Sequence, residues 1–281
     1  MSIAITSVNG QLGQAIALEA ITQLGPNQVI GLARTPSKAS HLGIEVRKGD
    51  YNNPDTLTAS LQGIESVLLI SGLDAPDKRI QQHRNVIEAV KNAGVKKIVY
   101  NSIYGTVCQS DFDAIIECNR QTEKDIKDSG LEYSIGRNGL YLEADLEAVQ
   151  DYKETGKISN CAADGRCAYT TRKELARAYV NLLTENKHLG KTYQLCGPAI
   201  TQDELAQYIN TAFHSHLIYT SISVEAYKQD RINVYGEFFG GIIAGIYDCI
   251  RKGSFNVPSD FNKILGRPHQ SLEEQIQEFL S

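Results

Sequence analysis

Short apolar runs alternate with amphipathic segments along the first half of the chain. The runs predict strands at residues 2–6, 28–33, 44–50, 66–71, 96–102 and 132–138. Between them, apolar residues at helical spacing predict helices at 11–24, from Pro36, 54–61, 77–92 and 113–128. Asn53 as N-cap and Pro54 at the first helical position mark the start of the third of these helices. Strands apolar on both sides and separated by helices are typical of a parallel sheet covered on both faces. The pattern therefore predicts a doubly wound α/β domain with right-handed crossovers over residues 1–142.

This rhythm changes after about Leu142. A segment with a short strand, a glycine-containing turn and a helix capped by Thr170 or Thr171 follows, and 191–197 reads as another strand. We expect the strand and helix within about 168–197 to return to the first, Rossmann-type domain. The remainder of 143–281 is predicted to form a smaller, mainly helical lobe on the substrate side.

Further helices are predicted within this lobe. Thr201 and Glu204 form a capping box at the start of one helix, and residues 271–280 form another helix. The apolar segment 238–250 is either a buried helix or a dimer surface, and burial is the favoured interpretation.

The first strand leads into a glycine-containing turn, NGQLG, at residues 9–13. Gly10 allows close approach of the backbone to a pyrophosphate, and Gly13 allows the helix to lie against the strand. Ser7 stands where a further glycine would permit a positive φ. We expect the loop to shift slightly and still bind. The predicted cofactor contacts here are those of Thr6, Ser7, Asn9, Gly10, Gln11 and Leu12.

The end of the second predicted strand indicates which dinucleotide fits. No acidic residue is present there to bind a ribose 2′-hydroxyl. The position is occupied by Arg34 instead, and Lys38 adds a second positive charge. A guanidinium binds a 2′-phosphate by two charge-assisted bonds, so Arg34 favours NADP(H). A solvated arginine at a strand end is the plainer alternative.

Two further strand ends face the same region. Ser71 and Gly72 are small enough to let the ribose and pyrophosphate pass. Asp50 either meets the adenine or caps the next helix, and the residues do not decide between these roles.

Composition narrows the class of protein. The 281 residues carry a formal charge of -5 and 42% apolar residues, so no basic field favours nucleic acid. No apolar window is long enough to span a membrane, and the N-terminus does not resemble a secretory signal. We expect a cytoplasmic protein whose six cysteines are reduced. His214 and His216 form a weak candidate metal pair without further ligands, so no metal site is predicted.

The ordered motifs resemble one family over nearly the whole chain. They are NGQLG (9–13), LARTPSKA (32–39), VRKGDY (46–51), LLISG (68–72), QHRNVIEAVKNAGVKKIVY (82–100), RNGLY (137–141) and AGIYDCIRKG (244–253). The chain resembles the NmrA-like atypical short-chain dehydrogenases, and among them the type 2 NAD(P)H:quinone oxidoreductase and triphenylmethane reductase group. The resemblance implies an NADP(H)-binding domain, a small lobe, and a cleft between them. It also implies that Asn138, Gly139 and Tyr141 lie near the nicotinamide.

The chain departs from the family pattern at three places. Ser7 replaces the first loop glycine, and Asn119 stands where group members often carry a histidine. The Tyr-x-x-x-Lys pair of ordinary short-chain dehydrogenases is missing, because Tyr104 is followed four residues later by Cys108. The usual proton relay for alcohol oxidation is therefore absent.

An electrophilic acceptor needs less assistance. Hydride transfer to a quinone-like or dye-like molecule requires mainly proximity and orientation. Tyr104 or Tyr141 could donate a hydrogen bond to the acceptor, or either could be a packing residue, and Asn138 shapes the loop. The sequence thus predicts an NADPH-dependent reductase, monomeric or homodimeric. The alternatives are an NADP(H)-binding redox sensor that acts through a protein partner, and a scaffold that no longer binds nucleotide.

Overall fold

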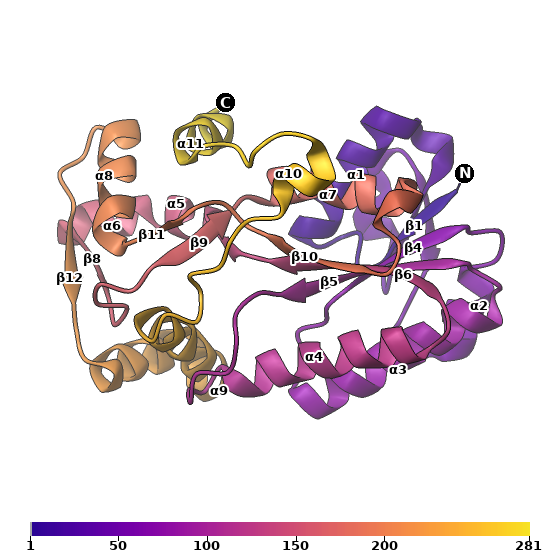
Figure 1. Cartoon of the computed structure of the whole chain (residues 1–281), viewed down its shortest axis with the longest axis horizontal. Coiled ribbons are helices and arrows are strands. Elements are labelled where there is room, and N and C mark those ends of the chain that lie inside the picture. Colours follow the sequence, from indigo (N-terminus) through magenta and orange to yellow (C-terminus); the bar gives the residue numbers. More distant parts are fainter. Residues whose placement is uncertain (1) are drawn as a thin grey trace.

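The structure is a computed structural model that describes residues 2–281, and a parallel sheet forms its centre (Figure 1). All neighbouring strands run in the same direction. Their order across the sheet is β10 (Lys191–Leu195), β6 (Glu132–Asn138), β5 (Lys97–Ile103), β4 (Ser66–Ile70), β1 (Ile3–Ile5), β2 (Val29–Ala33) and β3 (Glu45–Lys48). The order reverses between β1 and β4, as in doubly wound folds. The predicted fold class is confirmed.

Helices cover both faces of this sheet, as Figure 1 shows. One face packs on α1 (Gln11–Leu24), α7 (Arg172–Thr184) and α10 (Phe261–Leu265). The other face packs on α2 (Pro54–Ser60), α3 (Pro76–Asn92) and α4 (Asp113–Asp128). Short 3₁₀ turns occupy Pro26–Gln28, Pro36–Leu42 and Asn186–His188. Both faces of the inner strands β1, β2, β4 and β5 are therefore mainly apolar, as the sequence pattern requires, whereas the edge strand β3 has no buried residue.

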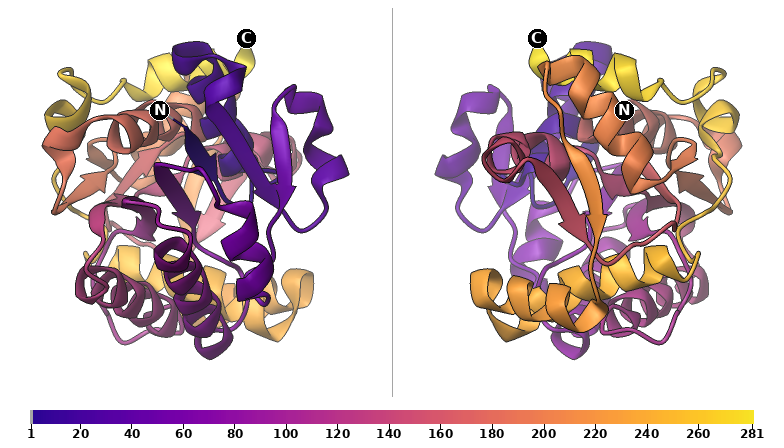
Figure 2. Two further views of the ribbon diagram at one scale, coloured as in Figure 1. Left: turned by 90° about the vertical axis from the view of Figure 1, so that its right-hand side faces the viewer. Right: turned by 90° about the vertical axis from the view of Figure 1, so that its left-hand side faces the viewer.

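A smaller unit lies beyond the carboxyl ends of these strands (Figures 1 and 2). It contains a sheet of β11 (Ala199–Ile200), β9 (Cys167–Thr170) and β7 (Leu140–Tyr141), and a parallel pair of β12 (Ile218–Ser221) and β8 (Lys157–Asn160). Its helices are α5 (Glu143–Glu147), α6 (Val149–Thr155), α8 (Gln202–Phe213), α9 (Val224–Arg251) and α11 (Leu272–Leu280). Helices and small sheets share one apolar core.

Local signals placed several helix ends correctly. Asn53 and Thr171 accept hydrogen bonds from the third residue of α2 and α7, and Thr201 forms the expected capping box of α8. These side chains satisfy backbone N–H groups that a helix cannot pair by itself.

The apolar segment 238–250 is the second arm of a bent helix, α9. Gly236 leaves the helical conformation at φ 78° and ψ 168°. A Cβ on Gly240 would lie 2.5 Å from the Ile232 backbone, so the two arms pack closely against each other. Much of the second arm is buried from Gly240 to Ile250, as expected, whereas Phe238 and Phe239 are exposed.

Candidate functional site

The candidate site lies at the carboxyl ends of the central strands, where the strand order reverses. The loop after β1 runs through residues 6–10 into α1, and the loops after β2 and β4 flank it. In open α/β sheets, ligands bind outside the carboxyl ends at this switch point. Most residues that the sequence singled out for the cofactor lie on these loops or at the start of α1, whereas Asp50 follows β3, and Asn138 and Gly139 lie at the end of β6.

Ser7 adopts the backbone conformation that a glycine would have offered, with φ at +49°. The carbonyl of Ser7 accepts the Gly10 N–H at 2.9 Å, which closes the turn before α1. A Cβ on Gly13 would lie 2.4 Å from the Ser7 oxygen and 2.9 Å from the Val8 Cα. The helix therefore lies directly against the turn, and only glycine fits at position 13.

The first turn of α1 presents backbone N–H groups without partners. Gly10 is the N-cap and has no side chain to bond them, and no acid stands in the first turn. The N–H groups at such a helix start lack intrahelical acceptors and carry partial positive charge. Asn9, Gly10 and Gln11 are exposed, whereas Leu12 packs into the core. This arrangement is suited to binding a pyrophosphate.

Arg34 and Lys38 bring positive charge to the end of β2. Both side chains are exposed, and neither has a hydrogen bond or ion pair within residues 2–281. The Arg34 charge contributes to holding the pKa of Asp74 below its usual value, after larger effects of hydrogen bonds from Lys78 and Gln82. The positive charge of Arg34 therefore acts on the loop after β4, where Asp74 lies. The Arg34 guanidinium is free to bind an anion.

Beneath the loop, Tyr51 joins three segments of the sheet edge. Its hydroxyl lies 2.5 Å from Thr6 Oγ1 and 3.2 Å from Ser7 Oγ, and it donates to the Ile70 carbonyl at 2.8 Å. Thr6 Oγ1 also accepts the Ile70 N–H at 2.9 Å. Burial raises the pKa of Tyr51, so the hydroxyl stays protonated. The Thr6 side chain is therefore used in supporting the loop.

Of the two alternatives for Asp50, helix capping is excluded by this structure. Its carboxylate accepts the backbone and side-chain N–H groups of Asn52 at 3.0 and 3.1 Å. Asn53, and not Asp50, caps α2. A contact of Asp50 with adenine stays a prediction.

The loop after β4 is held by His83, which the sequence reading did not select. Its Nε2 accepts the Gly72 N–H at 3.1 Å, and Nδ1 lies 2.9 Å from Thr122 Oγ1. Because Nε2 accepts, the proton resides on Nδ1. Burial, reinforced by the Arg79 charge, lowers the pKa of His83 to about 3, so the ring is neutral. A histidine at helical spacing from the apolar residues Val86 and Ile87 is the sequence feature that could have indicated a buried role for His83.

Ser71 is fixed from the other side. Its N–H donates to Asn101 Oδ1 at 2.7 Å, and its hydroxyl is 3.4 Å from Asn119 Oδ1. Asn119 also accepts the Tyr100 hydroxyl at 2.7 Å and is fully buried. Asn119 therefore supports the loop at Ser71 in the position where relatives were expected to carry histidine.

On the lobe side, Asn138 is buried and both ends of its amide are occupied. Oδ1 accepts the Tyr179 hydroxyl at 2.6 Å, and Nδ2 donates to the Tyr141 hydroxyl at 3.2 Å. Gly139 donates its N–H to the Leu195 carbonyl, and a Cβ there would lie 2.6 Å from the Ala168 oxygen. Asn138 and Gly139 thus shape the chain that carries Tyr141.

Tyr141 keeps its own hydroxyl proton available. The hydroxyl accepts from Asn138, and its proton has no acceptor within residues 2–281. Burial raises the pKa of Tyr141, and the Arg172 guanidinium lies 5.2 Å from its ring centre. A protonated donor therefore stands at the end of the loop.

Tyr104 does not fit the role of a donor. It is 3% exposed, its hydroxyl lies 3.1 Å from Cys167 Sγ, and its ring stacks on Phe255 at 4.6 Å. This burial argues against the catalytic alternative for Tyr104, which stays a prediction. Packing is the role that its contacts indicate.

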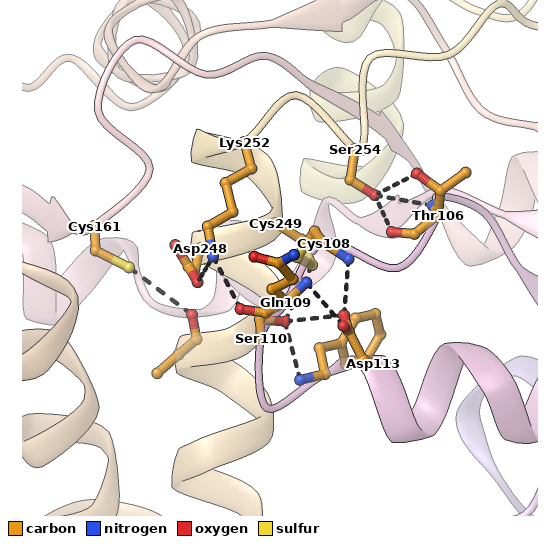
Figure 3. The surroundings of a disulfide bond; sticks show 12 residues. Thr106, Cys108, Gln109, Ser110, Asp113, Cys161, Asp248, Cys249, Lys252 and Ser254 are labelled. Atoms are coloured by element: carbon orange, nitrogen blue, oxygen red, sulfur yellow. Dashed lines mark hydrogen bonds and ion pairs between the residues drawn. A yellow bond between two sulfur atoms is a disulfide. The ribbon is translucent and has the colours of Figure 1, made fainter.

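The cysteines require a correction. Cys108 and Cys249 form a disulfide, so the expectation that all six are reduced is wrong for these two (Figure 3). The pair is 141 residues apart in sequence and offered no spacing signal. The other four are free and buried. Asp113 lies within 4.8 Å of both bonded sulfurs, but sulfurs joined to each other are not free thiolate ligands.

The weak candidate metal pair, His214 and His216, lies in an exposed segment between α8 and β12. His214 ends α8 with φ at 50°, and both it and His216 are exposed. They precede β12 and do not share a strand face.

Comparison with known proteins adds independent evidence. The chain matches a family described as NAD(P)H-binding over residues 8–186. It is 32% identical over 286 residues to quinone oxidoreductase 2 of Escherichia coli, which covers 98% of this chain and 97% of the relative.

Solved structures agree with this result. A triphenylmethane reductase of Citrobacter sp., complexed with NADP(H), is 34% identical with a TM-score of 0.90 over 99% of each chain. The NADPH-dependent quinone oxidoreductase of Escherichia coli, complexed with NADPH, is 32% identical with a TM-score of 0.90, over 99% of this chain and 100% of that one. In residues 2–281, no helix has the length and apolar character needed to cross a membrane.

Proposed function

The chain belongs to the NAD(P)H-binding, NmrA-like family, and from that premise we propose that it is an NADPH-dependent reductase of quinone-like or dye-like acceptors. The observation that carries the proposal is the juxtaposition of a bare helix start with the unpaired Arg34. Two anionic groups of one dinucleotide, the pyrophosphate and the 2′-phosphate, match these two features. The full-length similarity to a quinone reductase and a dye reductase supports the acceptor class.

The residues present fit this cofactor. A Cβ at Gly13 would fill the space that lets α1 approach the turn, so the loop keeps its cradle. We propose that the N–H groups at Gln11 and Leu12 hold the pyrophosphate and that Arg34, with Lys38, holds the 2′-phosphate. Ser71 and Gly72 are small residues that leave room for the ribose and pyrophosphate. Their N–H groups are fixed by hydrogen bonds to Asn101 and His83, respectively.

When bound, NADPH supplies a hydride from its nicotinamide ring. The chain orients the acceptor and steadies the charge that develops on its oxygen or on its conjugated system. Tyr141 is the proposed hydrogen-bond donor, because its proton is free and its hydroxyl is fixed by Asn138. A dye cation needs no such donor, since the hydride itself quenches it, so Tyr141 is expected to matter more for quinones.

A redox sensor is the second candidate function. Tyr235, Phe238 and Phe239 are 52%, 43% and 48% exposed, as an open surface for a protein partner would be. Such a protein would bind NADP(H) without turning over acceptors. We further propose a monomer or homodimer located in the cytoplasm, where the disulfide would be subject to reduction.

Calorimetric titration tests the cofactor site first. Wild type, Arg34→Ala and the control Arg84→Ala are titrated with NADPH and NADH; Arg84 is an arginine of α3 paired with Asp125 at 2.7 Å. Loss of a charge-assisted contact is expected to weaken NADPH binding roughly ten- to a hundredfold, with little effect on NADH. Absence of binding of either dinucleotide to wild type would remove the proposal.

Turnover then separates the two candidates. NADPH oxidation is followed with substituted benzoquinones and with triphenylmethane dyes. Acceptor-dependent oxidation supports the reductase. Tight NADPH binding without turnover of any acceptor supports the sensor.

A further inference from the structure

The disulfide joins the loop after β5 to the second arm of α9 (Figure 3). Cys108 lies in the loop between Tyr104 and α4, and Cys249 lies near the end of α9. The loop begins beside Asn138, which fixes the proposed donor Tyr141, because the Tyr104 N–H donates to the Asn138 carbonyl at 3.1 Å. The bond is thus a covalent link between the site and the lobe.

Non-covalent contacts hold the same two segments together. Ser254 Oγ accepts the Thr106 N–H at 2.9 Å and donates to the Thr106 carbonyl at 2.5 Å. Lys252 Nζ donates to the Gln109 carbonyl at 3.0 Å. These hydrogen bonds lie in exposed positions, where water competes for each partner. Without the disulfide, this docking would be weaker but still possible.

The loop is shaped for the bond by Asp113. Its carboxylate accepts the N–H groups of Cys108 and Gln109 at 2.9 and 2.8 Å, and Gln109 is held at φ +61°. Backbone geometry of this kind is costly for a residue other than glycine, and it persists only when surrounding contacts enforce it. The same carboxylate lies within 4.8 Å of both sulfurs.

Chemical access is one-sided. Cys108 borders a surface hollow of about 360 Å³, together with Val107, Lys252 and Gly253, whereas Cys249 is fully buried. An external thiolate can attack Cys108 Sγ and release Cys249 as the leaving thiolate. Ser110 Oγ is 3.2 Å from Cys249 Sγ and can donate to the sulfur that leaves.

We propose that Cys108 and Cys249 are a reversible redox pair that quinone-class acceptors oxidise and cellular dithiols reduce, and that its disulfide fastens the loop 104–112 to α9. In the oxidation, two thiols give up two electrons and two protons. An S–S bond forms, two S–H bonds break, and the quinone becomes a hydroquinone. A dithiol reverses the step and leaves as its own disulfide. The quinone part of this proposal rests on the proposed function.

The chemical step is tested without NADPH. Protein reduced with dithiothreitol and then freed of it is mixed with tetramethyl-1,4-benzoquinone, whose ring carbons are all substituted and therefore resist addition of thiols. Wild type and the control Cys118→Ser are expected to lose two hydrogens in mass and yield a peptide pair linked through Cys108 and Cys249, with one hydroquinone per protein. Cys108→Ser is expected to yield neither. Quinone that leaves the reduced wild type unlinked would overturn the proposal.

The consequence is tested by hydrogen exchange of the oxidised and reduced wild type. Amides in 104–112 are expected to exchange at least about threefold faster after reduction, while those of α1 keep their rates. Cys249→Ser should match the reduced wild type in both redox conditions. Equal rates in both forms of wild type would show that the bond does not fasten the loop. Neither readout uses turnover, so failure of the reductase proposal and failure of the redox pair are distinguishable.

Discussion

The cofactor side of the site and the lobe differ in how their polar groups are satisfied. On the cofactor side, Tyr51, His83 and Asn101 bond the strand-end loops to one another, and the side chains of Arg34 and Lys38 face solvent. In the lobe, one carboxylate oxygen of Asp145 is buried without a partner among the described residues, and Phe238 and Phe239 are exposed. The loops of the cofactor side are therefore held in place by hydrogen bonds before a ligand binds, whereas the lobe contains a buried polar atom without a hydrogen-bond partner among the described residues.

This difference has an energetic meaning. A preformed loop costs little ordering entropy when a dinucleotide binds, so its charges contribute fully to affinity. A buried carboxyl group with one hydrogen bond destabilises the lobe instead. The lone bond of Asp145 comes from the Tyr152 hydroxyl at 2.9 Å, and burial raises the pKa of Asp145 from 3.8 to about 6.

The largest expected effect breaks the preformed side. Gly13→Val places atoms where a Cβ alone would lie 2.4 Å from the Ser7 oxygen, so α1 must move away from the turn. We expect NADPH affinity to fall more than about a hundredfold, and overpacking to lower the free energy of unfolding by about 1–3 kcal/mol. Calorimetry and urea denaturation measure the two effects. Gly10→Ala, whose Cβ would be 3.3 Å from the same oxygen, is the milder control. A Gly13→Val protein that binds NADPH normally would contradict the cradle.

The next prediction tests the incomplete side through pH. A carboxyl whose folded pKa lies above its unfolded value binds more protons in the folded state. The contribution of Asp145 to the free energy of unfolding therefore falls as pH rises from 3.8 toward 6, and it stays lower above pH 6. The shift corresponds to a penalty of about 3 kcal/mol at pH 8.

Asp145→Asn removes this titration and keeps an oxygen for Tyr152. Relative to wild type, its free energy of unfolding should rise by up to about 3 kcal/mol between pH 4 and pH 8. The exposed Asp151→Asn is the matched control, since it lacks the burial. Urea denaturation at both pH values gives the difference, and a parallel pH dependence of variant and wild type would refute the assignment to Asp145.

Sequence alone predicted much more of the cofactor side than of the lobe. The caps Asn53 and Thr171 and the close glycine Gly13 act through neighbours a few residues away, so local patterns reveal them. The disulfide between Cys108 and Cys249, and the pairing of β8 with β12, join segments that are far apart in the chain. The role of His83 depends on a contact with Gly72 across two elements. Such relations follow from tertiary packing and leave no periodic trace.

A smaller effect separates the two tyrosines. Tyr141→Phe removes the free hydroxyl proton and is expected to lower kcat for quinones about tenfold, with little change in NADPH affinity. Tyr104→Phe removes a bond to Cys167 and should cost about 1 kcal/mol of stability with kcat nearly unchanged. Steady-state kinetics on both variants decides the matter. A larger loss of kcat in Tyr104→Phe would restore the catalytic role that its burial argues against.

The smallest expected effect concerns Ser7, the residue that departs from the family loop. Its φ of +49° is the conformation that glycine adopts freely, so Ser7→Gly relieves strain of about 1 kcal/mol. The same change loses the contact of Ser7 Oγ with the Tyr51 hydroxyl, and glycine gains entropy in the unfolded chain. These terms oppose each other, so the net change in stability should stay within about 1 kcal/mol.

NADPH affinity should change less than about threefold in Ser7→Gly, because Ser7 already has the positive φ that glycine would adopt and the N–H groups of α1 are expected to keep their positions. Calorimetry on this variant compares directly with Gly13→Val, since both act on one turn from opposite sides. A gain of more than tenfold would mean that serine holds the loop away from the pyrophosphate. An unchanged affinity, beside a large loss at Gly13, would place the requirement for glycine in the packing of helix against turn and not in the torsion angle at position 7.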